Sequence, residues 1–180
     1  MALALRQLAR RIDAAQDRLG RGVSWIMLLM VLVVFFDVVL RYAFSKSAVW
    51  LQELEWHLFG VVYLVGAAYT MLYDEHVRVD IVYSRFSSRG KAWVDFILYL
   101  VFFYPSAIMI VWTTWPFVAS SYRVMEGSPD PGGIPLRFVL KSVIIVGFVL
   151  LIIQAFSQTV KNFFWAMGWE ERAVRVHEVH

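Results

Sequence analysis

The 180-residue sequence contains no cysteine, and it has only four histidines and five prolines. The absence of cysteine excludes disulfide bonds, thiolate catalysis, cysteine-ligated zinc and iron–sulfur clusters. The sequence also lacks the catalytic patterns HExxH and GxSxG and the Walker phosphate-binding loop. Since the sequence shows neither a nucleophile–base pair nor a cluster of metal ligands, we expect that this protein is not an enzyme and holds no metal.

Charged residues are also scarce, at 17% of the chain, whereas hydrophobic residues make up 60% and the mean hydropathy is +0.62. A soluble domain is about half apolar and about one quarter charged. The composition therefore indicates a membrane protein. The net charge of +3 does not predict nucleic-acid binding, because basic residues on cytoplasmic loops give membrane proteins a positive balance.

Four apolar runs are long enough to cross a membrane as helices, since about twenty such residues cover the roughly 30 Å of hydrocarbon. These runs lie at about residues 23–44, 49–73, 93–115 and 135–160. We predict an all-α fold in which residues 1–180 form a single domain, an integral membrane four-helix bundle. Pro105 lies in the middle of the third run and predicts a kink or a close packing point there.

The N-terminal segment, residues 1–21, has an amphipathic pattern. Its apolar residues recur at spacings of three and four, with arginines and aspartates on the other faces: Leu5, Leu8, Ile12, Ala15 and Leu19. The arginines are mixed through the segment, which argues against a cleavable signal peptide. We predict an interfacial helix on the membrane surface, continuous with the first span or hinged at Gly20 and Gly22. A solvated N-terminal helix is the alternative.

Basic residues gather on one side of the predicted bundle. Twelve of the 17 lysines and arginines lie in the N-terminal segment, in the connection 74–92 and in the tail from residue 161 onward. The other five are Arg41, Lys46, Arg123, Arg137 and Lys141. By the positive-inside rule, both termini and the 74–92 connection are cytoplasmic. The predicted orientation is therefore N-in and C-in.

A few ionisable residues lie within or beside the predicted spans, where charges usually face protein or water. Asp37 and Arg41 are four residues apart, which favours an ion pair on one helix; a proton or ion site is the alternative for Asp37. Glu53 has three possible roles. It could pair with Arg41 or Lys46 across the hairpin of the first two spans, accept a hydrogen bond from a partner subunit, or carry a coupling ion. His57 follows Glu53 by one helical turn.

Three further features concern the second connection, the last span and the third connection. His76 is best explained as a hydrogen-bonded interfacial histidine, because no second ligand stands at metal-binding spacing. Gln154 and Gln158 are four residues apart in the last span and can bond to a neighbouring helix. The Pro- and Gly-rich stretch SSYRVMEGSPDPGGIP predicts an exposed loop, of the kind that often contacts partners.

A haem-binding membrane anchor of a redox complex is an alternative of similar size. It needs axial ligands on facing helices within the membrane. Only His57 of the four histidines lies in a predicted span, which disfavours a bis-histidine haem.

The stretch from Arg41 to Asp80 resembles the small membrane subunit, the DctQ-like component, of tripartite ATP-independent periplasmic (TRAP) transporters. The shared features are an arginine–aromatic pair, a Trp-x-x-Glu, a Gly-Ala-Ala and a His-Val-x-Val-Asp, which stand in order at Arg41–Tyr42, Trp50–Glu53, Gly66–Ala68 and His76–Asp80. The later segment SPDPGGIPLRFVLKS is similar to one branch of that family. Asp37 matches no feature of the family.

The resemblance implies a three-part, sodium-driven uptake system in the bacterial inner membrane. In such a system a periplasmic binding protein delivers an organic acid to a pair of membrane subunits. The large subunit carries the substrate and sodium sites, and the small subunit scaffolds it without a cofactor of its own. The implied partners are the large subunit, the binding protein and membrane lipids, and not nucleic acid.

The residue pattern and the resemblance together lead us to expect roles for single residues. Those expected at structural or subunit interfaces are Asp37, Arg41, Trp50, Glu53, His57, His76 and Asp80. Those expected to face the periplasm as candidate contacts for the binding protein are Lys46, Arg123 and Asp130, the last within the Ser128–Gly133 loop. The substrate itself is not encoded in this chain, since selectivity would lie in the other two proteins.

Overall fold

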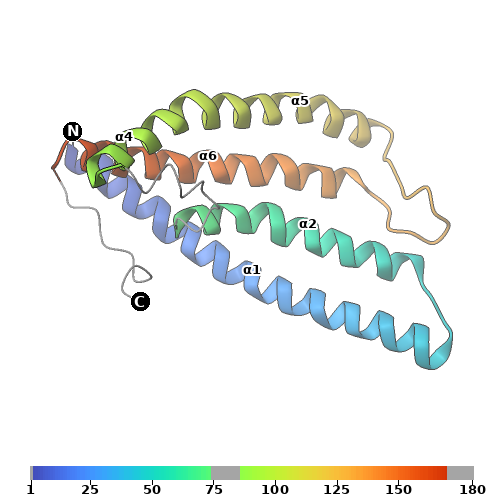
Figure 1. Cartoon of the computed structure of the whole chain (residues 1–180). Helices are drawn as coiled ribbons and strands as arrows, with labels where there is room; N and C mark the ends of the chain where they lie inside the picture. Colours follow the sequence, from blue (N-terminus) through green and yellow to red (C-terminus); the bar gives the residue numbers. More distant parts are fainter. Residues whose placement is uncertain (1, 74–85, 170–180) are drawn as a thin grey trace.

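The computed structural model describes residues 2–73 and 86–169, and every regular element in these stretches is a helix. The helices run side by side as a bundle (Figure 1). In chain order they are α1 (Ala2–Phe44), α2 (Val49–Leu72), α4 (Ser88–Leu98), the π-helix η1 (Tyr99–Phe103), α5 (Tyr104–Arg123) and α6 (Phe138–Ala166). The predicted all-α class is confirmed.

Helix α6 is the centre of the bundle, since it packs against α1, α2, α4, η1 and α5. Small residues allow this close approach. A Cβ atom placed on Gly147 of α6 would lie 2.8 Å from the carbonyl oxygen of Leu64 on α2. The small apolar core beside this contact consists of Ala68, Met71, Leu151 and Ala155. Helices α2 and α5 flank α6 on different sides, without close packing on each other in the described residues.

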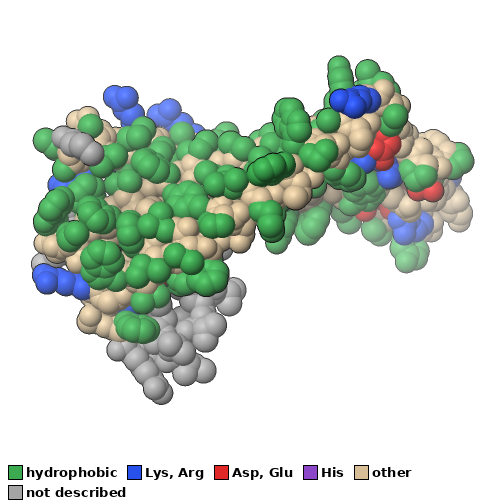
Figure 2. All heavy atoms as spheres, turned by 90° about the horizontal axis from the view of Figure 1, so that it is seen from above, with side chains coloured by type: hydrophobic (Ala, Val, Ile, Leu, Met, Phe, Trp, Pro, Cys, Tyr) green, Lys and Arg blue, Asp and Glu red, His purple; other side chains and the backbone are tan. Residues whose placement is uncertain are grey.

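The bundle is apolar outside and partly polar inside. Large side chains such as Phe35 and Trp112 are 59% and 78% exposed, whereas Gln154 and Ser157 are completely buried. Figure 2 shows hydrophobic side chains over most of one face and charged side chains gathered at its two ends. A soluble protein has the reverse distribution. The exposed apolar surface therefore suits a hydrocarbon environment, with polar groups used between the helices.

Among the described residues, three helices are long and apolar enough to cross a membrane: Ala2–Phe44, the continuous helix Ser88–Arg123, and Phe138–Ala166. Helix α2 has 24 residues, which is about 36 Å and long enough to span. Its first turns carry Glu53, Glu55 and His57, and these lower its mean hydropathy.

Of the two predicted arrangements, the structure shows the N-terminal segment continuous with the first span and not hinged, because α1 is one continuous helix of 43 residues. Its length is about 64 Å, roughly twice the thickness of the hydrocarbon layer. Gly20 has a packing role instead: a Cβ atom there would clash with the ring of Tyr69 on α2. The glycine therefore permits close contact between α1 and α2, while Gly22 faces open space.

The region around Pro105 contains the irregularity that the sequence predicts, in the form of the π-helix η1 directly before it. Proline has no N–H and therefore cannot donate the backbone hydrogen bond that a regular α-helix forms to the preceding turn. The wider π turn accommodates this loss, and α4 bends away from the line of α5 (Figure 1). The helix also extends further than predicted, from Ser88 to Arg123. The last helix starts later, at Phe138, because Leu136 has a left-handed backbone (φ 62°).

Candidate functional site

The most extensive polar site among the described residues lies where α2 begins and the 124–137 loop returns to α6. Glu53 on α2 is only 3% exposed. Its carboxylate accepts hydrogen bonds from Ser128 Oγ at 2.5 Å, from the backbone N–H of Ile134 at 2.5 Å and from Arg137 Nη2 at 2.9 Å. We call these four residues the Glu53 cluster. Three donors, one of them a guanidinium, satisfy the buried charge.

Arg137 connects the cluster to the rest of the molecule. Its guanidinium lies over the ring of Trp56 at 5.5 Å and also reaches Ser128 Oγ at 3.4 Å. Its backbone N–H donates to the carbonyl of Glu126 at 2.8 Å. Arg137 thus contacts α2 and the 124–137 loop, and its planar guanidinium both donates from Nη2 and lies over the Trp56 ring, a combination that suits arginine better than lysine.

The loop is folded closely over the Glu53 carboxylate. Gly132 has φ +83°, a conformation that glycine adopts without steric cost. A Cβ atom on Gly133 would clash with Ser128 and lie 2.7 Å from Glu53 Oε2. The N–H of Asp130 donates to Ser128 Oγ at 3.1 Å. These contacts explain the small residues of the SPDPGG segment, because larger ones would displace the loop from the carboxylate.

A second ion pair fastens the start of the loop to α6. Lys141 Nζ donates to Glu126 Oε2 at 2.5 Å and lies 4.0 Å from the ring centroid of Phe117 on α5. The hydrogen bond from Lys141 holds the pKa of the Glu126 carboxyl below its usual value. The pair therefore remains charged down to a lower pH than a free carboxylate would allow.

Of the three roles predicted for Glu53, pairing with Arg41 or Lys46 across the hairpin is wrong. Glu53 binds Arg137 of this same chain, 84 residues away, and neither Arg41 nor Lys46 contacts its carboxylate in the described structure. Arg41 instead pairs with Asp37 one turn earlier on α1, as the spacing predicts. Asp37 is 1% exposed, and its Oδ1 atom has no hydrogen-bond partner among the described residues.

The remaining predicted residues differ in their placement. Trp50 is half exposed on the first turn of α2, and His57 Nδ1 lies 2.6 Å from the backbone carbonyl of Glu53. Three exposed residues lie on the connections at one end of the bundle, which Figure 1 shows as the α1–α2 turn and the α5–α6 loop: Lys46, Arg123 and Asp130. His76 and Asp80 lie outside the described residues.

Polar contacts join the helices at the opposite end as well. Asp13 of α1 accepts from Gln154 at 3.0 Å, Ser157 at 2.6 Å and Lys161 at 3.1 Å, all on α6. Gln158 of α6 donates to the Met71 carbonyl on α2 at 2.8 Å. The predicted bonding of Gln154 and Gln158 to neighbouring helices is confirmed.

The sequence prediction missed Asp13 and Arg137 as contact residues. Asp13 stands among the aspartates and arginines that an amphipathic pattern assigns to solvent. Arg137 carries one available signal, because it precedes the last span on the same side of the membrane as Glu53. The chemistry of these sites is helix joining: among residues 2–73 and 86–169, no three His, Asp or Glu side chains are grouped as metal ligands would be.

Comparison with known proteins gives two findings. The family model described as "Tripartite ATP-independent periplasmic transporters, DctQ component" matches residues 30–164, which include the Glu53 cluster. A protein of Haemophilus influenzae named as a TRAP transporter small permease protein is 26% identical over 128 residues, covering 70% of this chain and 78% of that protein.

Proposed function

Because the chain belongs to the DctQ component family of tripartite ATP-independent periplasmic transporters, we propose that it is the small membrane subunit that scaffolds the large permease. The family is a transport component and not a family of enzymes. In this proposal the subunit lies in the bacterial inner membrane. A periplasmic binding protein delivers an organic acid, and the substrate and sodium sites belong to the large subunit.

The observation that carries the proposal is the Glu53 cluster together with the contacts between Asp13 and α6 at the opposite end of the bundle. In these two places the buried Glu53 and the partly exposed Asp13 accept hydrogen bonds from other segments of the same chain. Polar side chains used in this way fix the positions of the helices relative to one another. A rigid bundle with an apolar exterior is suited to holding a larger, moving partner in the bilayer.

We further propose that α2 also crosses the membrane. The chain then has four spans, and both termini lie in the cytoplasm. The distribution of basic residues supports this orientation. Because α1 is continuous from Ala2 to Phe44, we propose that the N-terminal segment does not lie flat on the membrane but leaves the hydrocarbon layer on the cytoplasmic side. Its Leu8 and Leu19, each 45% exposed, lie there beside exposed Arg11 and Arg18.

In the same proposal, the 124–137 loop faces the periplasm and contributes contacts to the binding protein. Its tip is exposed at Asp130, while its base is held by Ser128 and Ile134 on Glu53. A loop that is ordered before binding loses less conformational entropy when the partner docks. Arg123 and Lys46 are exposed at the same end of the bundle and extend this candidate surface.

The alternative of a haem anchor has no observation in its favour. His57 is the one histidine among the described residues, and its Nδ1 atom already lies against the Glu53 carbonyl. We propose no cofactor in this chain.

Co-expression with the adjacent large permease tests the scaffold role. We expect the tagged chain to retain the permease through detergent purification, and cells lacking the chain to lose substrate uptake and most of the assembled permease. A chain with Trp112→Leu, changed on the exposed face of α5, is the matched control for expression. Recovery of intact, active permease without the chain would contradict the proposal.

A further inference from the structure

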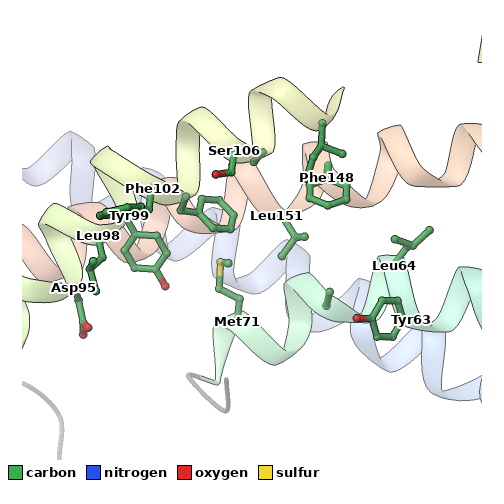
Figure 3. Close-up of a pocket in the computed structure, with 14 residues that line it drawn as sticks. Tyr63, Leu64, Met71, Asp95, Leu98, Tyr99, Phe102, Ser106, Phe148 and Leu151 are labelled. Atoms are coloured by element: carbon green, nitrogen blue, oxygen red, sulfur yellow. The ribbon is translucent and has the colours of Figure 1, made fainter. Parts of the chain in front are cut away.

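Three acidic side chains are buried among the described residues: Asp37, Glu53 and Asp95. Glu53 accepts the three hydrogen bonds described above. Asp95 lines the groove between α2 and the α4–α5 helix that Figure 3 shows, and it also has a partner. Asp37 is different, because its Oδ1 atom is buried without a hydrogen-bond partner in the described structure. The scaffold role does not account for this atom.

Glu55 of α2 carries a matching group. Its Oε1 atom and Asp37 Oδ1 are the two carboxylate oxygens that are buried without a hydrogen-bond partner in residues 2–73 and 86–169. Glu55 interacts electrostatically with both Asp37 and Arg41 of α1. The two acids lie at similar heights in the hairpin, each about 10 Å from the end of its helix nearest the α1–α2 turn. We call Asp37, Arg41 and Glu55 the Asp37 cluster.

The charges of the Asp37 cluster do not balance. Two ionised carboxylates and one guanidinium carry a net charge of −1, whereas the Glu53–Arg137 pair is neutral. Asp37 uses its Oδ2 atom for the ion pair with Arg41. Two carboxylates cannot form a hydrogen bond with each other, because both only accept. An uncompensated charge is costly between helices in a membrane, so the cluster lacks one positive charge and one hydrogen-bond donor.

One proton supplies both. A protonated carboxyl donates one hydrogen bond, and the added proton makes the cluster neutral. A hard metal cation needs six or more oxygen ligands, and the described residues contain no group of three His, Asp or Glu side chains that could hold a metal. A basic side chain of a partner could not reach Asp37, which is 1% exposed. A proton needs neither further ligands nor an opening.

From these observations we infer that Asp37 and Glu55 bind one proton between them, so that the carboxyl O–H of one acid donates to a carboxylate oxygen of the other. Two carboxylates that share a site do not both ionise readily. The shared proton joins α1 to α2, and Arg41 is the other charged group that acts on the pair. Loss of the proton at alkaline pH leaves two negative charges facing each other and weakens the contact between the two helices. This inference goes beyond the scaffold proposal, because it concerns a ligand of this chain and not its protein partners.

Infrared difference spectroscopy of the chain, purified with its permease, tests for the shared proton. A protonated carboxyl has a C=O stretching band that carboxylates and amides lack. Glu55→Gln and, independently, Asp37→Asn should each remove this band from the spectrum at neutral pH, because each variant leaves one carboxylate to balance Arg41. Glu126→Gln is the matched control, since the Glu126 carboxylate is paired with Lys141 and should contribute no such band. Retention of the band in either Glu55→Gln or Asp37→Asn would overturn the inference.

Thermal unfolding of the same complexes distinguishes a proton from a metal ion. The unmodified complex should lose more stability than Glu55→Gln on going from neutral to alkaline pH, because the amide has no proton to lose there. A stabilisation by sodium over choline that Glu55→Gln removes would identify a bound cation and would overturn the inference. Both variants should still assemble with the permease, since each amide has the size of the neutral acid, and failure of both would count equally against the inference. Failure of the scaffold proposal would appear in the unmodified chain, as loss of co-purification.

Discussion

At the scale of single residues, polar side chains join segments of the chain that are distant in the sequence. Glu53 receives donors from the 124–137 loop and from Arg137, and Asp13 receives donors from α6. In the hydrocarbon layer a polar group without a protein partner cannot form a hydrogen bond with water instead. Helix arrangements that break these contacts are therefore disfavoured. The polar side chains therefore determine the arrangement of a bundle whose apolar surfaces are largely interchangeable.

Gln158 provides a residue-scale test of this interpretation. It is 7% exposed and donates to the carbonyls of Met71 and Leu72 at the end of α2. Replacing it with leucine keeps its approximate size and removes both bonds, which should lower the free energy of unfolding by about 1 kcal/mol. Thermal or denaturant unfolding in detergent measures the change. Phe156→Leu, on the exposed face of the same helix, should have a much smaller effect, and equal effects would contradict the assignment.

At the scale of helices, the sequence predicted local pairs and the capacity of Gln154 and Gln158 to bond to a neighbouring helix, but it did not identify which distant residues come together. The Asp37–Arg41 pair and the irregularity near Pro105 follow from local spacing and local chemistry, and both are present. The sequence left open whether α1 is continuous or hinged at Gly20, because a glycine within a helix signals either flexibility or close contact, and only the position of Tyr69 decides between them. The Glu53–Arg137 pair joins residues 84 positions apart, which no local pattern can indicate.

The contact between α2 and α6 can be tested through Gly147. A methyl group at this position would approach the Leu64 backbone oxygen to 2.8 Å, so Gly147→Ala should force the helices apart. Overpacking of this kind should cost about 1–3 kcal/mol of stability. Gly22→Ala is the matched control, because its methyl group meets open space and alanine favours a helix. A stable Gly147→Ala variant alongside an unstable Gly22→Ala variant would contradict the packing described.

At the scale of the whole molecule, the charge distribution and the shape both indicate a membrane-spanning bundle whose two ends differ. One end carries the arginines of the N-terminal segment and the 86–91 segment, and the other carries the Glu53 cluster and the exposed loop. The 43-residue α1 is about 64 Å long and so reaches beyond the hydrocarbon layer. The proposed orientation assigns the first end to the cytoplasm and the second to the periplasm.

The absence of cysteine allows this orientation to be measured with single substitutions. Asp130→Cys should react with a membrane-impermeant maleimide in intact cells. Arg10→Cys should react only after the membrane is permeabilised, because its segment is predicted to be cytoplasmic. Lys46→Cys is a second external position, at the α1–α2 turn, and should behave like Asp130→Cys. Labelling of Arg10→Cys in intact cells, with Asp130→Cys protected, would reverse the orientation.

The central claim is that buried charges in this subunit hold its own segments in place so that the transporter can assemble, and an exchange of charges tests it most directly. Glu53→Arg and Arg137→Glu each leave two like charges facing one another, so each alone should abolish co-purification with the large permease and substrate uptake. The double variant restores an opposite pair at the same place and should recover a substantial part of both. Wild-type uptake and assembly in either single variant, or no recovery in a double variant that is inserted at normal levels, would contradict the claim.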